Sequence, residues 1–195
     1  MHAAGIKVWM LTGDKQETAI NIAMACSLVL SSMTVMVVDS EVDPAWSDSE
    51  IDAHVEKELQ TFLDQYGPAH NAQEQQQQQQ QQGGHSHGVS QSQLALVIEG
   101  NVLASALKPH LEGLFFELGR MCSSVVCCRV SPLQKALVTG LVRERANAVT
   151  LAIGDGANDV PMIQRAHVGV GIMGKEGMQA TMASDFAIGQ FRYDL

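Results

Sequence analysis

The sequence has neither the cysteine spacing of zinc-binding or disulfide-rich proteins nor the surplus of basic residues that is typical of nucleic-acid-binding proteins. Its four cysteines contain no Cys-x-x-Cys pair. We therefore expect buried free thiols in a reducing compartment, rather than a zinc site or a disulfide framework. The formal net charge of -9 argues against a general nucleic-acid binder, which would need a basic face to neutralise phosphates, although it permits a phosphate ligand held locally.

Secretory and membrane signals are missing as well. The chain opens Met-His-Ala-Ala-Gly-Ile-Lys, without the apolar region of a signal peptide. The uncharged stretch from Ile22 to Val38 falls short of the ~20 residues that a spanning helix needs. It is also broken by Ser27, Ser31, Ser32 and Thr34. We expect a helix end that runs into a strand, and a soluble isolated chain.

Short apolar runs do occur throughout the chain, and they alternate with helical patterns. In a chain of 195 residues, a hydrophobic content of 46% can supply the core of one sizeable domain. The strand-like runs are 6–11, 33–38, 94–98, 124–128, 148–153 and 168–172. This order predicts an α/β sandwich with a mainly parallel sheet, whose functional loops gather at the carboxyl ends of the strands.

A polar tract interrupts this pattern. Residues 71–93 include eight consecutive glutamines, Gln75 to Gln82, and offer almost nothing that could pack. We interpret 71–93 as a disordered insertion, with one part of a domain in 1–70, including a surface helix, and a second part in 94–195. His85 and His87 within the insertion suit either a metal site or a plain linker.

Two strand-to-helix loops carry groups that suit an anion. Thr12 and Gly13 follow the first strand, and Asp14 has the spacing of a helix N-cap with Glu17 as its capping-box partner. Free amides there would attract an anion, although a plain cap explains the same residues. In the second loop Ser131, Pro132 and Gln134 predict a helix start.

Lys135 falls on the first turn of that second helix, where the helix already carries partial positive charge. A lysine is easier to understand there if an anion lies opposite it. A solvated surface lysine is the other interpretation.

A third loop, Gly154-Asp155-Gly156-Ala157-Asn158-Asp159, follows the strand that ends at Ile153. Its carboxylates and amide are oxygen ligands that suit Mg²⁺ and the phosphate it carries. A simple surface turn has the same composition. Together the three loops offer the equipment of phosphoryl transfer, but a nucleophile is missing.

These residues resemble motifs of a known family. Met10 to Asp14, Pro132 to Lys135 and Gly154 to Asp159 resemble three motifs of the haloacid-dehalogenase fold as P-type ATPases use it. More narrowly, Cys127 to Lys135, Glu176 to Ala180 and Ser184 to Ile188 with Gln190-Phe191-Arg192 resemble the phospholipid-translocating subfamily, the flippases. The resemblance covers nearly the whole chain outside the glutamine-rich insertion and much of the helix before it.

The resemblance implies a three-layer fold and a role for each matched residue. Thr12 and Gly13 would hold the phosphoryl group, and Lys135 would neutralise its charge. Mg²⁺ and ATP are the implied cofactors, and the chain would be the carboxyl-terminal part of a phosphorylation domain. Asp14 and Arg129 would contact the nucleotide, and Asp155 would ligate magnesium. Asn158 and Asp159 would complete the metal and phosphate shell, with Asp159 as a second metal ligand.

The implied setting is the cytosolic face of a membrane, where the segment would belong to an integral membrane flippase that couples ATP hydrolysis to aminophospholipid transport. Its partners would be ATP and a phospholipid bound through membrane segments. The resemblance also allows an accessory subunit, and it implies no nucleic-acid partner. In this family an aspartate in an Asp-Lys-Thr-Gly-Thr loop takes the phosphate from ATP. That loop, the nucleotide-binding domain and the membrane helices do not occur in this sequence. We therefore expect the chain alone to be inactive.

The missing loop also matters for the fold. In the family, the strand that bears the acceptor aspartate lies between the strands that end here at Leu11 and Ile153. Its absence should leave unpaired backbone groups or force the sheet to close. Glu99, where the family usually has aspartate, and Asp194 are smaller departures, and neither is expected to touch the site.

Two alternatives to a flippase segment stay open. One is a truncated, non-catalytic product that binds nucleotide or magnesium, or that acts through its glutamine-rich loop. The other is a stand-alone phosphatase of the same fold, which would need an Asp-x-Asp nucleophile loop that the sequence does not contain.

Overall fold

The computed structural model describes residues 5–38, 45–67, 94–174 and 178–190. The insertion predicted over 71–93, with His85 and His87, and the residues at 191–195, including Asp194, lie outside them. The chain forms two compact units, Met1–Arg129 and Val130–Leu195. This division falls after Arg129 and not at the predicted insertion. The division into 1–70 and 94–195 stays a prediction.

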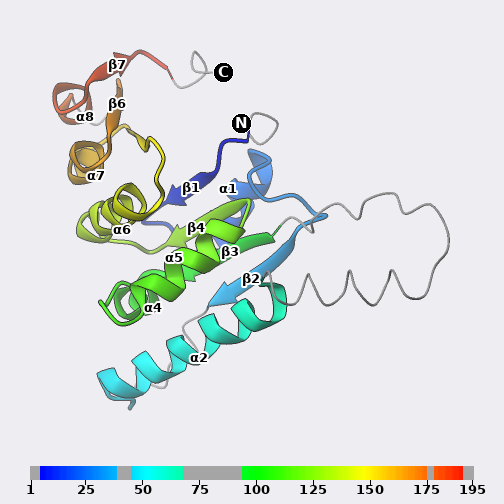
Figure 1. The fold of residues 1–195 in the computed structure, drawn as a ribbon. Helices are drawn as coiled ribbons and strands as arrows, with labels where there is room; N and C mark the ends of the chain where they lie inside the picture. Colours follow the sequence, from blue (N-terminus) through cyan, green and yellow to red (C-terminus); the bar gives the residue numbers. More distant parts are fainter. Residues whose placement is uncertain (1–4, 39–44, 68–93, 175–177, 191–195) are drawn as a thin grey trace. The chain divides into compact units, whose positions relative to one another are not determined.

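The first unit contains a four-stranded parallel sheet in the order β1-β4-β3-β2. Figure 1 shows its elements in blue to green. They are β1 (Val8–Leu11), α1 (Gln16–Ala25), β2 (Thr34–Val38), α2 (Asp48–Tyr66), β3 (Leu94–Glu99), α4 (Gly100–Ala106), α5 (Glu112–Met121) and β4 (Ser124–Cys128). Both central strands are buried along their whole length, as expected for a parallel sheet covered on two faces.

Helices cover both faces of this sheet. On one face, Ala19 and Ala23 of α1 pack against Val97 and Val126 of the central strands. The other helices, α2, α4 and α5, pack together, and α4 and α5 lie against β3 (Figure 1). The small side chains on α1 allow this helix to lie close to the sheet. Because helices cover both faces of the sheet, the unit is a three-layer α/β/α sandwich.

The second unit contains a three-stranded parallel sheet in the order β5-β6-β7. Its elements, yellow-green to red in Figure 1, are α6 (Pro132–Arg145), β5 (Leu151–Gly154), the 3-10 turn η2 (Ala157–Asp159), α7 (Val160–Arg165), β6 (Val168–Ile172), α8 (Gln179–Met182) and β7 (Phe186–Ile188). Glycines on β6 let the helices approach closely. A Cβ at Gly169 would lie 2.6 Å from Ile163 Cγ2, and one at Gly171 would lie 2.5 Å from Thr181 Cα.

The expected α/β class with mainly parallel pairing is confirmed. The strands that end at Leu11 and near Ile153, namely β1 and β5, are edge strands of their own sheets among the strands that the structure describes. Every open sheet has such edge strands, so the predicted gap left by the acceptor strand stays a prediction. Within the described residues, no helix is both long and apolar enough to cross a membrane.

Candidate functional site

The Thr12–Asp14 loop is closed by its own polar groups at the carboxyl end of β1. The Thr12 amide donates to Cys127 O at 2.9 Å, so the loop starts from the neighbouring strand β4. The Thr12 hydroxyl donates to Asp14 Oδ2 at 2.9 Å, and the Asp14 amide donates to Thr12 Oγ1 at 3.1 Å. Gly13 and Asp14 are exposed, so the loop is open to a ligand.

The prediction that Asp14 caps the following helix is wrong. Helix α1 begins at Gln16, its N-cap is Lys15, and no side chain caps it. The physical reason is local, because the Asp14 carboxylate accepts from the Thr12 hydroxyl instead of from amides of the first helical turn. Thr12, Gly13 and Asp14 therefore form a separate loop before the helix.

Arg129 is held next to this loop in an unusual backbone conformation. Its φ of 51° lies in the left-handed region, which is costly for a residue with a Cβ. Its amide donates to Asp14 O at 2.8 Å. The structure therefore brings Arg129 and the Thr12–Asp14 loop together within the first unit.

Glu99 also belongs to this group of residues. Its Oε1 lies 2.9 Å from Nη1 of Arg129, and the Glu99 side chain is only 6% exposed. The expectation that Glu99 stays clear of the site is therefore wrong. One signal in the sequence could have identified it, because Glu99 is the single acid that ends the apolar run Leu94 to Ile98, and a buried carboxylate requires a partner.

In the second unit, Lys135 and Asp159 form a buried ion pair among the predicted site residues. Lys135 Nζ donates to Asp159 Oδ1 at 2.7 Å, and each side chain is only 12% exposed. Local sequence explains the position of Lys135, because Ser131 and Gln134 form the predicted capping box and α6 starts at Pro132. The anion opposite Lys135 is thus a carboxylate of the same chain, and the lysine is not a solvated surface residue.

Asp159 also holds the Gly154–Asp159 loop in shape. Its Oδ2 accepts from the amides of Asp155 at 3.2 Å and Gly156 at 3.4 Å. Glycine is required at position 154 because a Cβ there would lie 2.3 Å from Asp159 Cβ. One buried carboxylate therefore fixes both the lysine and the backbone that carries Asp155.

The donor set fits Mg²⁺ in part. Asp155 and Asn158 are exposed in the same loop, and both carry oxygen ligands. Mg²⁺ is usually held by one or two carboxylates together with waters and substrate phosphates. No group of three or more His, Cys, Asp or Glu side chains gathers for a metal within the described ranges. The remaining ligands would have to come from phosphate oxygens and water.

The predicted site residues thus fall into two groups. Thr12, Gly13, Asp14 and Arg129 meet in the first unit, while Lys135, Asp155 and Asp159 meet in the second. Asn158 lies in the same loop as Asp155. Each group lies at the carboxyl end of a parallel strand, where α/β proteins bind ligands.

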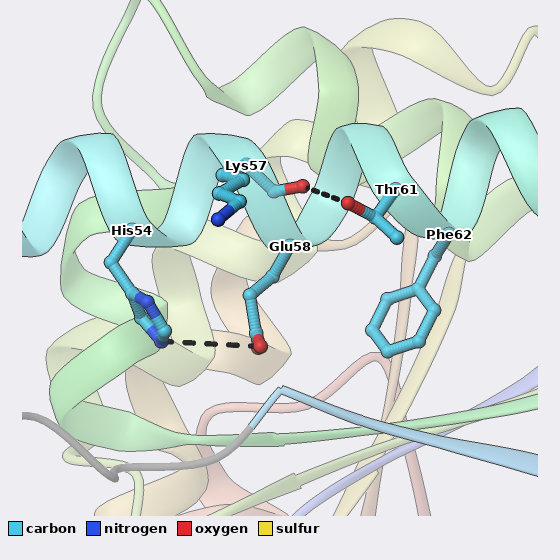
Figure 2. Close-up of a pocket in the computed structure, with 5 residues that line it drawn as sticks. All are labelled: His54, Lys57, Glu58, Thr61 and Phe62. Carbon is cyan, nitrogen blue, oxygen red and sulfur yellow. Dashed lines mark hydrogen bonds and ion pairs between the residues drawn. The ribbon is translucent and has the colours of Figure 1, made fainter.

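A pocket of about 200 Å³ lies elsewhere, on α2. Figure 2 shows its lining residues, all from this one helix: His54, Lys57, Glu58, Thr61 and Phe62. His54 Nε2 lies 4.0 Å from Glu58 Oε1, and the Thr61 hydroxyl donates to Lys57 O at 2.7 Å. The pocket contains none of the predicted site residues, so we do not assign the phosphoryl chemistry to it.

Three of the four cysteines, Cys122, Cys127 and Cys128, are too deeply buried to supply the missing nucleophile. Burial raises the pKa of Cys122 to about 12 and that of Cys128 to about 11, and it raises the pKa of Cys127 further still. Because the thiolate is the reactive form of cysteine, these three thiols are inert near neutral pH. The expectation of buried free thiols is confirmed for these three cysteines and is wrong for Cys26, which is exposed.

No family model matches the chain. Individual proteins do match it closely. The chain is 46% identical to phospholipid-transporting ATPase C887.12 of Schizosaccharomyces pombe over 99% of its own length and 13% of that protein. It is 44% identical to phospholipid-transporting ATPase DRS2 of Saccharomyces cerevisiae, with 99% of the chain and 12% of that protein covered. It is 47% identical to probable phospholipid-transporting ATPase 12 of Arabidopsis thaliana, with 97% and 15% covered.

These matches extend across both units, whereas the chain spans only 12–15% of the length of these relatives. The motifs at Thr12, Lys135 and Asp155 lie within the matched length. With its α/β fold of parallel sheets, the chain therefore belongs to the phospholipid-transporting P-type ATPases.

Proposed function

We propose that the chain is the segment of an ATP-driven phospholipid flippase that supplies magnesium, phosphoryl and nucleotide contacts. The similarity to phospholipid-transporting ATPases over nearly the whole chain supports the setting. The observation that carries the chemistry is the buried Lys135–Asp159 pair, whose carboxylate also holds the amide of Asp155. A buried lysine next to an exposed carboxylate suits a phosphate and its metal.

The second unit would bind the metal and the phosphoryl charge. Asp155 would ligate Mg²⁺, with Asn158 and Asp159 completing the shell. A bound Mg²⁺ would neutralise the negative charge on phosphoryl oxygens. Asp159 accepts one N–H of the Lys135 ammonium, and an ammonium has three N–H donors, so Lys135 could donate to a phosphoryl oxygen at the same time.

The first unit would hold the phosphoryl group and the nucleotide. The Thr12 hydroxyl and the Gly13 amide would contact phosphoryl oxygens, and Asp14 and Arg129 would lie on the nucleotide path. The acceptor aspartate, whose carboxylate takes the phosphoryl group from ATP and releases ADP, would come from the longer polypeptide. The lipid path, the membrane and any accessory subunit would also belong to that longer protein.

Magnesium titration of the ¹⁵N-labelled chain tests the proposal. We expect amide signals of residues 154–159 to shift on addition of Mg²⁺ with a non-hydrolysable ATP analogue, and Asp155→Asn to weaken this response at least about 10-fold, because a charged contact is lost. Glu144→Gln is the matched control, because Glu144 is an exposed carboxylate of the same unit. An unchanged response in Asp155→Asn would remove this residue from the metal site.

A second experiment uses a longer polypeptide that carries this segment. There Asp155→Asn should abolish formation of the magnesium-dependent phosphoenzyme, measured with radiolabelled ATP. Undiminished phosphoenzyme would contradict the assignment. If the isolated wild-type chain binds neither magnesium nor nucleotide, an interaction role becomes the better account of this chain by itself.

A further inference from the structure

Glu99 is a buried acid that the proposed phosphoryl chemistry does not use. It is the last residue of β3, it is 5% exposed, and the rest of that strand is apolar. In the sheet register Glu99 lies opposite Cys128, so its side chain is on the same face of the sheet as the residue before Arg129. A carboxylate in such a position is costly unless a cation compensates it.

Arg129 provides that cation, and it is constrained in two ways. Nη1 of its guanidinium lies 2.9 Å from Glu99 Oε1, while its amide donates to Asp14 O at 2.8 Å. Its left-handed φ of 51° persists only because the surroundings hold it. The backbone is thus tied to the Thr12–Asp14 loop and the side chain to the end of β3.

The Arg129 side chain nevertheless remains accessible, because 53% of it is exposed. A guanidinium has five N–H donors in a fixed plane, so a carboxylate that engages part of it can leave other donors for a ligand. Holding a long side chain in one orientation before binding removes an entropy cost at the moment of binding. The geometry therefore suits an arginine prepared for a second anion.

We propose that Glu99 is a positioning residue that orients the guanidinium of Arg129 to bind the phosphates of a nucleotide. This inference rests on the proposed function, because it takes nucleotide to be the ligand of Arg129. Glu99 itself does not touch the nucleotide. It acts through the ion pair and connects the end of β3 to the loop that carries Thr12.

The test uses the full 195-residue chain and two readouts. The first is the NMR signal of the Arg129 side-chain N–H groups without nucleotide, and the second is the affinity for Mg²⁺ and a non-hydrolysable ATP analogue. We expect Glu99→Ala to broaden or shift the Arg129 signal and to weaken nucleotide binding at least about 10-fold. Glu99→Gln, which keeps an oxygen acceptor, should retain the signal and most of the affinity.

A double-mutant cycle separates positioning from a purely structural effect. If Glu99 acts through Arg129, Glu99→Ala should weaken binding no further in a chain that already carries Arg129→Ala. Additive losses in the double variant would overturn the inference. Glu144→Gln serves as the control in the other unit, and its affinity should equal that of the wild-type chain.

The two proposals fail in different ways. If the wild-type chain binds nucleotide and Glu99→Ala binds it equally well, only the role of Glu99 is overturned. If the wild-type chain binds no nucleotide, the proposed function of this chain fails and the role of Glu99 fails with it. Should Glu99→Ala not fold, Arg129→Ala decides: positioning through Arg129 predicts that this variant weakens nucleotide binding at least about 10-fold, and an unchanged affinity would overturn the inference.

Discussion

Lys135 and Asp159 lie 24 positions apart in the sequence and form a 2.7 Å ion pair whose two side chains are each only 12% exposed. Lys135 is placed by the first turn of α6, and Asp159 ends the 3-10 turn after β5. The pair therefore ties the start of a helix to the loop that carries Asp155.

Breaking this pair should destabilise the second unit. In Lys135→Ala the buried Asp159 carboxylate loses its cation, so we expect the free energy of unfolding to fall by about 3 kcal/mol. Urea unfolding followed by circular dichroism measures this. Glu144→Ala is the control, because it breaks the exposed Arg165–Glu144 pair and should cost less than about 1 kcal/mol. Equal losses in the two variants would show that the Lys135–Asp159 pair is not special.

Gly154→Ala should distort the Asp155 loop. The added methyl group would lie 2.3 Å from Asp159 Cβ, so the loop or β5 has to move. We expect a loss of about 1–3 kcal/mol in unfolding free energy together with shifted amide signals at Asp155 and Gly156. At Gly189 an added Cβ meets nothing within 4 Å, and Gly189→Ala should leave both measurements unchanged.

The start of α6 should depend on Ser131. Gln134 N donates to Ser131 Oγ at 3.2 Å, and Ser131 N donates to Gln134 Oε1 at 2.9 Å. Ser131→Ala removes one of these bonds and should cost about 1 kcal/mol of stability. Ser131→Asp keeps a capping oxygen and should be close to the wild-type chain. A large loss in Ser131→Asp would argue against capping as the cause.

Thiol chemistry should distinguish Cys26 from the other cysteines. Cys26 is exposed, whereas Cys122, Cys127 and Cys128 are buried. Titration with Ellman's reagent at pH 8 should therefore release about one equivalent from the native chain and about four from the chain in denaturant. Rapid release of more than one equivalent from the native chain would contradict the burial of these thiols.

The same thiols should make stability depend on alkaline pH. Burial raises the pKa of Cys122 from 9.0 to about 12 and that of Cys128 from 9.0 to about 11. A raised folded-state pKa stabilises the native state fully below the unfolded value. That contribution is lost as pH rises from about 9 through the folded values. The free energy of unfolding should therefore decline above pH 9, and Cys128→Ala should reduce the slope. An unchanged slope would assign the decline to other groups.

Sequence pattern predicted most elements of this fold correctly. The runs 124–128 and 168–172 are strands β4 and β6 with those bounds, and α6 starts at Pro132 with the expected cap. Such features depend on local composition, turn chemistry and capping, which a short window of sequence contains. The short final elements α8 and β7 were not predicted, because four and three residues carry little periodicity.

The errors concern polar groups with more than one available partner. Asp14 has the spacing of a cap, yet its carboxylate pairs with Thr12. Glu99 was expected to stay clear of the site, but it binds Arg129. Local spacing cannot decide such a choice, since the competing partner is positioned by the loop conformation or by a neighbouring strand. The roles of Thr12, Arg129, Lys135 and Asp155 in binding remain predictions for the titrations above.

The sequence by itself determined the α/β class, the three polar loops and the resemblance to flippases, because these depend on local pattern and motif. Tertiary structure alone decided the strand order β1-β4-β3-β2 and the separate sheet β5-β6-β7. It also decided the pairs Glu99–Arg129 and Lys135–Asp159. The physical reason is that periodicity specifies which residues are buried, whereas the packing of segments that are distant in the sequence specifies the partner of each buried charged side chain.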